Sequence, residues 1–155
     1  MQEMNGQIAL VTGAGRGIGS AIAKSLAKEG ATVIVNYAGN AQAAQDTVDS
    51  ILKDGGSAEK YQCDVSDFAA VEEMIKYVVQ KYEKIDILVN NAGITKDGLL
   101  LRMSEQDFEQ VLAVNLRGTF HCIRHAAKYM IKQRSGRIIN ITSVSGIMGN
   151  PGQAN

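Results

Sequence analysis

Apolar residues along this 155-residue chain follow two alternating patterns. Short, continuous apolar runs rich in β-branched residues are typical of strands that are buried on both faces. Between these runs, apolar residues recur three or four positions apart, which is typical of amphipathic helices. The pattern predicts strands at residues 8–11, 31–35, 58–62, 85–89 and 137–142, with a helix between each strand and the next.

The predicted helices end at glycines or polar turns. The clearest apolar stripe covers residues 71–82, and the longest helix starts near Glu105 and ends before Ser135-Gly136. Strands that alternate with helices through short joints indicate a parallel sheet covered on both faces, with right-handed crossovers. We therefore predict an α/β fold, namely a Rossmann-like doubly wound parallel sheet in the strand order 3-2-1-4-5.

The last predicted strand, at residues 137–142, is as apolar as a central strand. Nothing between this strand and Asn155 would cover it, and an exposed apolar edge strand promotes aggregation. We therefore expect the chain to be part of a larger fold, or to need a partner on that side of the sheet.

Composition and charge narrow the function classes. A chain that is 45% hydrophobic and 21% charged is not wholly disordered. Sixteen basic and 16 acidic residues balance, so the charge predicts no general affinity for nucleic acid or for a membrane surface. No apolar stretch is long enough for a membrane helix, and no signal peptide is visible. Cys63 and Cys122 lie far apart, which favours reduced thiols in a cytoplasmic protein.

Residues 12–19, Thr-Gly-Ala-Gly-Arg-Gly-Ile-Gly, join the first predicted strand to the first helix. In such a joint Gly13 permits the tight turn, Gly17 lets the backbone approach a pyrophosphate, and Gly19 lets helix and sheet pack closely. The spacing is Gly-x-x-x-Gly-x-Gly rather than the commoner Gly-x-Gly-x-x-Gly. The segment predicts a dinucleotide site; the alternative is a glycine-rich turn without a ligand.

This glycine-rich segment resembles the cofactor motif of the short-chain dehydrogenases/reductases. Residues 90–93, Asn-Asn-Ala-Gly, are similar to that family's second motif, Asn115 to its helical asparagine, and Ser143 to its catalytic serine. Residues 94–100 and 149–155 are similar to the corresponding parts of the 3-oxoacyl-acyl-carrier-protein reductases of bacterial-type fatty acid synthesis.

The resemblance implies NADPH-dependent reduction of a 3-oxoacyl thioester, linked to acyl carrier protein, to the 3-hydroxyacyl form in fatty acid biosynthesis. The alternatives are a relative that acts on acetoacetyl-CoA, a sugar or another alcohol, and a catalytically incomplete NADP-binding module. The family's catalytic Tyr-x-x-x-Lys would begin immediately after Asn155. We therefore expect residues 1–155 to be the N-terminal, dinucleotide-binding part of a single Rossmann-fold domain, without the family's C-terminal strands.

The cofactor preference depends on the end of the second strand. An acidic residue there would bind the ribose 2′-hydroxyl of NAD, but this chain has Asn36 and Tyr37. Arg16 could face the 2′-phosphate of NADP(H); the alternative is a solvated loop charge. We therefore predict NADP(H). The predicted cofactor-binding residues are Thr12, Gly13, Gly15, Arg16, Gly17, Ile18, Gly19, Asn36, Tyr37, Asp64, Val65, Asn91, Ala92 and Gly93.

Asp64 and Val65 end the third predicted strand. The resemblance implies that the Asp64 carboxylate accepts a hydrogen bond from the adenine amino group. The alternative is that Asp64 caps the following helix, a role that Ser66 or Asp67 could also fill.

Two polar residues are the predicted catalytic groups. The resemblance implies that Ser143 binds the substrate carbonyl oxygen, which gains negative charge during reduction, and that Asn115 holds a water of the proton relay. The alternatives are a loop serine and a solvent-facing helical asparagine. His121 and His125, four positions apart beside Cys122, could hold zinc, but no third ligand is in register, so we predict no metal.

The outer face of the long helix carries candidate protein contacts. Its end is basic, with Lys128, Lys132, Arg134 and Arg137. These charges either compensate the helix dipole or, as the resemblance implies, dock an acidic acyl carrier protein through Arg134. Val114 and Phe120 are expected on an outer face that forms a homo-oligomer, a dimer or tetramer.

Overall fold

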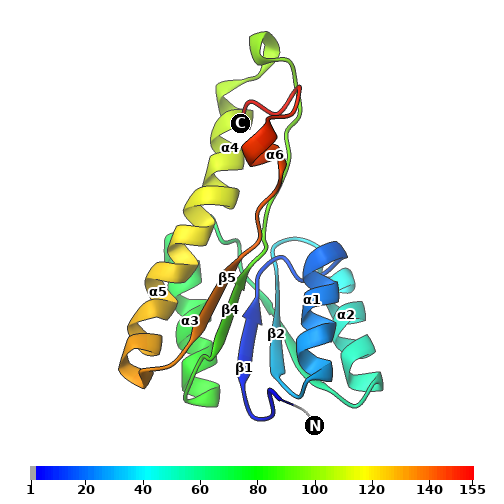
Figure 1. The fold of residues 1–155 in the computed structure, drawn as a ribbon, viewed down its shortest axis with the longest axis vertical. Coiled ribbons are helices and arrows are strands. Elements are labelled where there is room, and N and C mark those ends of the chain that lie inside the picture. Colours follow the sequence, from blue (N-terminus) through cyan, green and yellow to red (C-terminus); the bar gives the residue numbers. More distant parts are fainter. Residues whose placement is uncertain (1–2) are drawn as a thin grey trace.

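The computed structural model describes residues 3–155 (Figure 1). Within these residues, five parallel strands form one sheet in the order β3-β2-β1-β4-β5, so the predicted fold class and strand order are confirmed. The strands are β1 (Ile8–Val11), β2 (Thr32–Tyr37), β3 (Ser57–Gln62), β4 (Ile87–Asn90) and β5 (Arg137–Asn140).

Helices cover both faces of this sheet (Figure 1). Helices α1 (Gly17–Lys28) and α2 (Ala41–Lys53) pack on one face, and α3 (Phe68–Tyr82) and α5 (Gly118–Gln133) pack on the other. The shorter elements are η1 (Leu100–Arg102), α4 (Glu105–Val111), η2 (Leu112–Arg117) and α6 (Ser145–Met148).

Alternate residues of the central strands supply two separate cores. Leu10, Ile34 and Leu88 face α3 and α5, whereas Val11 and Val89 face α1 and α2. All five side chains are buried, which explains why their strands are nearly continuous apolar runs. Burial of this kind is the main driving force of folding, so these two cores fix the sheet that positions the site.

The long helix predicted from Glu105 is interrupted. The structure contains α4, then the π-helical segment η2, then α5, and Asn115 lies inside η2. The Thr119 hydroxyl donates a hydrogen bond to the Asn115 carbonyl at 3.0 Å in this wider turn. A π-helical turn is one residue longer than an α-helical turn and is found most often near functional sites.

Chain order creates a reversal beside β1. Strands β2 and β4 flank β1, and the crossovers that reach them lie on opposite faces of the sheet. The loops after β1 and β4 therefore lead to opposite faces from neighbouring points at the carboxyl edge of the sheet, which is where ligands bind in open α/β folds.

The C-terminal region is far more exposed than the rest of the sheet. All four residues of β5 are exposed, as expected for the uncovered edge, and Ile139 keeps 46% of its surface accessible. In Figure 1 α4 and α6 extend beyond the carboxyl edge of the sheet. Exposed apolar residues gather in this region: Leu99, Leu100, Leu101, Val144, Ile147 and Met148. Within residues 3–155, no helix combines the length and apolarity needed to cross a membrane.

Candidate functional site

A cleft of about 660 Å³ opens at the carboxyl edge of the sheet, where the loops after β1 and β4 converge. Every predicted cofactor-binding residue except Thr12 lines it. The lining residues are Gly13, Gly15, Arg16, Gly17, Ile18, Gly19, Asn36, Tyr37, Ala38, Gly39, Asn40, Ala43, Cys63, Asp64, Val65, Asn91, Ala92, Gly93, Ile94 and Val114.

Thr12 lies beneath the cleft and joins its two main loops. Its side chain is buried, and its hydroxyl oxygen accepts hydrogen bonds from the N–H groups of Asn91 and Ala92, both at 3.0 Å. The Asn91 amide returns hydrogen bonds to the carbonyls of Thr12 and Gly13, at 3.0 and 3.2 Å. These four bonds hold the exits of β1 and β4 together, so the sequence motif at residues 90–93 acts as a structural brace.

The glycine-rich loop presents hydrogen-bond donors to the cleft. Its carbonyls are satisfied by the protein: those of Gly13, Gly15 and Arg16 accept hydrogen bonds from Asn91, Thr47 and Ser20, respectively. By contrast, the N–H groups of residues 15–18 find no acceptor among residues 3–155. Free N–H groups at the positive end of the α1 dipole form an anion site, as the pyrophosphate prediction requires.

The three motif glycines have different surroundings, which test the fit of a pyrophosphate. A Cβ atom on Gly13 would lie 2.8 Å from the Ala92 Cα atom, and one on Gly19 would lie 2.6 Å from the Gly13 carbonyl oxygen. A Cβ atom on Gly17 would meet nothing within 4 Å, although its φ of +57° favours glycine. Gly13 and Gly19 therefore allow close packing behind the loop, and Gly17 faces open space where a phosphate could approach.

Asn36 supports the cleft from inside the sheet. Its buried side chain accepts the Gly13 N–H at 3.2 Å and donates to the Cys63 carbonyl at 3.0 Å, which ties the ends of β1, β2 and β3. The amide predicted to contact the cofactor thus has its main partners within the protein. Beyond β2, residues 38–40 also line the cleft, and these were not predicted from the sequence.

The lip of the cleft at residues 37–40 contains no carboxylate. Asn40 caps α2 by accepting the Ala43 N–H at 2.9 Å, and a polar cap residue before a helix was the available signal for this segment. Arg16 is exposed at the rim, and its guanidinium has no ion pair or hydrogen bond within residues 3–155. Arg16 is therefore free to bind an anion at this lip.

Asp64 is not the cap of α3. Asp67 fills that role by accepting hydrogen bonds from the N–H groups of Ala69 and Ala70, at 2.9 and 3.0 Å. One Asp64 oxygen accepts from the N–H and hydroxyl of Ser66, at 2.9 and 2.7 Å. The carboxylate therefore lines the cleft in a fixed orientation, since Ser66 restrains it.

Asn115 lies directly behind the cleft wall. Its side chain accepts the Ile94 N–H at 2.9 Å and donates to the Ile94 carbonyl at 3.0 Å. A Cβ atom on Gly93 would lie 3.5 Å from its amide oxygen. The two bonds attach the η2 turn to the loop after β4, so Asn115 does not project freely from a helix.

Ser143 does not line the cleft. It follows β5, whose Asn140 lies beside Asn90 of β4, so it emerges at the same edge of the sheet. Its side chain is exposed, and its hydroxyl oxygen accepts the Ser145 N–H at 3.1 Å. The structure thus places Ser143 at the same edge of the sheet as the cleft but outside the cleft lining, and its catalytic role stays a prediction.

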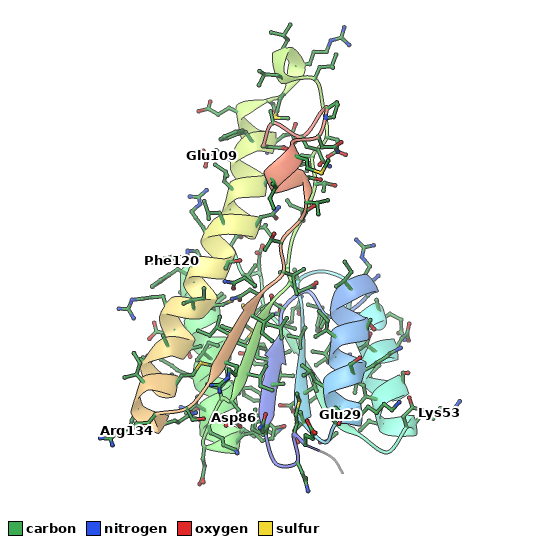
Figure 2. All side chains as sticks on the ribbon, in the orientation of Figure 1. Glu29, Lys53, Asp86, Glu109, Phe120 and Arg134 are labelled. Carbon is green, nitrogen blue, oxygen red and sulfur yellow. The ribbon has the colours of Figure 1, made fainter. Side chains whose placement is uncertain are left out.

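The structure places three residues that were predicted at the surface, and one of them, Val114, needs correction. Arg134 follows α5 in a left-handed conformation at the end of the molecule opposite the cleft, where Figure 2 labels it. The α5 helix separates Arg134 from the cleft wall by about 24 Å, because its 16 residues rise about 1.5 Å each. Val114, predicted on the outer face, is half-buried and lines the cleft, whereas Phe120 is exposed as expected (Figure 2).

The histidines and cysteines of this region are buried, and within the described residues the Nε2 atom of His125 has no hydrogen-bond partner. His121 bonds the Val65 carbonyl through Nδ1 at 2.9 Å, and the Phe68 ring lies 4.3 Å from that of His125. No group of three metal-ligating side chains occurs in the described part of the chain. Burial raises the pKa of both Cys63 and Cys122 to about 12, so both are neutral thiols at physiological pH.

A Tyr-x-x-x-Lys spacing does occur in the chain, at Tyr77 and Lys81 in α3. The Lys81 ammonium pairs with Glu59 of β3 and donates to the Tyr77 hydroxyl at 3.1 Å. Neither residue lines the cleft, so this pair braces the β3 edge of the sheet and is not placed to act on a ligand there.

Known proteins share this architecture. The family described as short chain dehydrogenase matches residues 7–155. The chain belongs to the short-chain dehydrogenase family. This short-chain dehydrogenase is 52% identical over 155 residues to the 3-oxoacyl-[acyl-carrier-protein] reductase of Synechocystis sp., which covers 100% of this chain and 63% of the relative.

Another relative bears a similar name. The 3-oxoacyl-[acyl-carrier-protein] reductase FabG of Staphylococcus epidermidis is 53% identical over 147 residues, which are 95% of this chain and 60% of the relative. The short-chain dehydrogenase described here thus spans about three fifths of the length of these two curated relatives.

Solved structures agree with the fold. A crystal structure of a short chain dehydrogenase from Mycobacterium avium superposes with a TM-score of 0.89 at 40% identity, covering 97% of this chain and 57% of that one. A structure of NAD⁺-bound xylitol dehydrogenase superposes with a TM-score of 0.93 at 37% identity, covering 98% of this chain and 58% of that one.

Proposed function

We propose that this chain binds NADP(H) in the cleft, and that the protein reduces a 3-oxoacyl thioester linked to acyl carrier protein to its 3-hydroxyacyl form. The observation that carries the proposal is the cleft itself. It combines a loop of unpartnered N–H groups with a free Arg16 and has no carboxylate at the lip formed by residues 37–40. The names of the two curated relatives support the substrate class.

Each part of the cleft has a proposed role in cofactor binding. The N–H groups of residues 15–18 hold the pyrophosphate, Arg16 meets the 2′-phosphate beside Gly39 and Asn40, and Asp64 accepts the adenine amino group. Arg suits this role because its guanidinium is always charged and matches phosphate geometry. NADPH bound there would supply the hydride.

The proposed catalytic groups act on the substrate rather than on the cofactor. Ser143 donates a hydrogen bond to the carbonyl oxygen as it becomes negative, which stabilises the transition state. Asn115, held by both main-chain groups of Ile94, positions a water near the cleft wall. We propose that the proton donor is the tyrosine of a Tyr-x-x-x-Lys motif, as the family resemblance implies.

The remaining proposals concern partners and location. Because Arg134 lies at the far end of α5, it can contact the carrier protein but not the reacting thioester. The exposed apolar residues Leu116, Phe120 and Ile131 support a homo-oligomer, a dimer or tetramer, that covers the outer side of η2 and α5. We place the enzyme in the cytoplasm, and we take residues 1–155 as the dinucleotide-binding part of one Rossmann-fold domain.

A second candidate is an NAD-dependent polyol dehydrogenase. The close superposition on NAD⁺-bound xylitol dehydrogenase favours it. The match covers 98% of this chain but only 58% of the xylitol dehydrogenase chain, and a shared fold does not separate the two substrates.

The deciding experiment measures cofactor binding and turnover together. The purified native protein is titrated with NADPH and NADH by cofactor fluorescence. Oxidation of each nucleotide is then followed with a 3-oxoacyl thioester and, separately, with a ketose. We expect tighter binding of NADPH and turnover of the thioester only. Ser143→Ala should lower turnover about 100-fold and leave NADPH affinity nearly unchanged, because one donor to the developing oxyanion is lost.

Ser145→Ala, two positions along the same segment, is the matched control and should keep full turnover. Failure to take up either nucleotide would contradict the cofactor proposal. Turnover of the ketose with NADH would instead support the polyol candidate. Equal loss of binding and turnover in Ser143→Ala would remove the role assigned to Ser143.

A further inference from the structure

A buried hydroxyl on α2 holds the glycine-rich loop. Thr47 is only 3% exposed, its hydroxyl donates to the Gly15 carbonyl at 3.1 Å, and it lies 2.8 Å from the Ser20 hydroxyl of α1. A hydroxyl has one proton to donate, so Ser20 must donate to Thr47 while Thr47 donates to Gly15. The chain Ser20–Thr47–Gly15 therefore links α1, α2 and the loop. Thr47 belongs to none of the motifs found in the sequence.

This link fixes a peptide unit of the cleft. The Gly15 carbonyl and the Arg16 N–H belong to the same planar, trans peptide, in which the two groups point in opposite directions. Because Thr47 holds the carbonyl, it also sets the direction of the Arg16 N–H and the point where the Arg16 side chain leaves the loop. A Cβ atom on Gly15 would lie 3.3 Å from the Ala44 nitrogen, so α2 is seated directly against this peptide.

The same helix forms the opposite wall. Gly39 and Asn40 precede α2, and Ala43, one turn before Thr47, lines the cleft with them. Arg16, on the glycine-rich loop, lines the same cleft as these residues. The hydrogen bond from Thr47 to Gly15 thus sets the separation between the arginine and the lip of the cleft.

We propose that Thr47 is a positioning residue for selection of the cofactor's 2′-phosphate, acting through the Gly15–Arg16 peptide. The inference rests on the proposed binding of NADP(H). Thr47 does not line the cleft and touches no ligand there. NADH has no 2′-phosphate, so its affinity depends on the N–H groups of the loop but not on the spacing between Arg16 and the lip.

The test compares dissociation constants for NADPH and NADH across matched variants of the native protein. Thr47→Val keeps the side-chain shape and removes the hydroxyl, Thr47→Ser keeps the hydroxyl, and Arg16→Ala is the reference for loss of the 2′-phosphate contact. Thr47→Val should weaken NADPH about tenfold, roughly the effect of one lost hydrogen bond, and NADH much less. Thr47→Ser should restore most of the wild-type ratio.

Ile51→Val is the matched control, because it shortens a buried side chain of the same helix without touching the loop. An unchanged NADPH-to-NADH ratio in Thr47→Val overturns the inference, as does an equal change in Ile51→Val or no recovery in Thr47→Ser. If Thr47→Val does not fold, Thr47→Ala removes the same hydroxyl and decides in the same way. If the wild type binds neither nucleotide, or Arg16→Ala leaves its ratio unchanged, the proposed function fails first and the inference falls with it.

Discussion

The half of the sheet around β1 and the half that ends in β5 are built from similar sequences but reach different states. All residues of β1 and β4 are buried, and α1, α2 and α3 complete their cores. All residues of β5 are exposed, although Ile138 and Ile139 are as apolar as their counterparts in β4. An apolar strand sequence is therefore not enough to bury a strand. The strand is buried only where helices cover both faces of the sheet.

The same contrast separates the two parts of the candidate site. The glycine-rich loop is held by buried or half-buried groups, namely Thr12, Asn36, Asn91 and Thr47. The segment after Ser143 is held by exposed bonds: Gly98 N–H to the Gly152 carbonyl, and the side chains of Gln153 and Asn155 to Asp97 and Lys96. Exposed hydrogen bonds with few apolar contacts mark low local stability. The cofactor side is thus expected to be rigid, and the Ser143 side to open more readily.

Shortening one apolar side chain in each half of the sheet should give the largest difference, measured as the loss in free energy of unfolding. Leu10→Ala removes a fully buried side chain of β1 and should lower the free energy of unfolding by about 2–5 kcal/mol. Ile139→Ala removes a half-exposed side chain of β5 and should cost less than about 1 kcal/mol. Urea denaturation of both variants measures the difference. Equal losses would mean that β5 is packed as tightly as β1.

Much of this architecture could be predicted from sequence because the central strands are buried on both faces. Residues 8–11 and 32–35 form continuous apolar runs, which only a covered parallel strand requires. The η2 segment was not predicted, since a shift in backbone hydrogen-bond register leaves no mark on apolar spacing. Ile18 was predicted to bind the cofactor, and its exposed side chain does line the cleft.

Site positions that require glycine could be predicted from the sequence. The direction in which a side chain points at the site was harder to predict. A Cβ atom on Gly13 or Gly19 would clash with backbone, so only glycine fits at these positions, and the motif can be recognised in the sequence. Asn36 was placed at the right strand end, but its amide turns inward to Gly13 and Cys63. Thr47 lies 32 residues from Gly15, and only tertiary packing brings them together.

Substitution of one glycine in each part of the site should give effects on stability of intermediate size. Gly19→Ala would push a methyl group against the Gly13 carbonyl and the Asn91 side chain, so it should lower stability by about 1–3 kcal/mol and abolish measurable nucleotide binding. Gly146→Ala in α6 meets no atom within 4 Å and should change neither property. Cofactor titration and urea denaturation distinguish them. Normal nucleotide binding by Gly19→Ala would show that the loop yields easily, contrary to the rigidity assigned to it.

The reactivity of single thiols compares the two parts of the site residue by residue, and it is the smallest of the expected effects. Burial raises the pKa of Cys63 and Cys122 to about 12, so in the folded protein at pH 8 both should react with iodoacetamide far more slowly than free thiols. A cysteine introduced by Val144→Cys, where the native side chain is 71% exposed, should react at nearly the rate of a free thiol. Labelling followed by mass spectrometry reports each site separately, and urea should make all three react alike.

The pH dependence of stability follows from the same shift. Above pH 9, which is the ordinary pKa of a thiol, the unfolded chain loses these protons, whereas the raised pKa lets the folded chain keep them up to about pH 12. The folded state is therefore favoured fully below pH 9 and progressively less as the pH rises toward 12. Replacing both cysteines with alanine should flatten this part of the urea-denaturation profile. If Cys63 were labelled as fast as Val144→Cys in the folded protein, the cofactor side would open as readily as the Ser143 side, and the contrast between them would be lost.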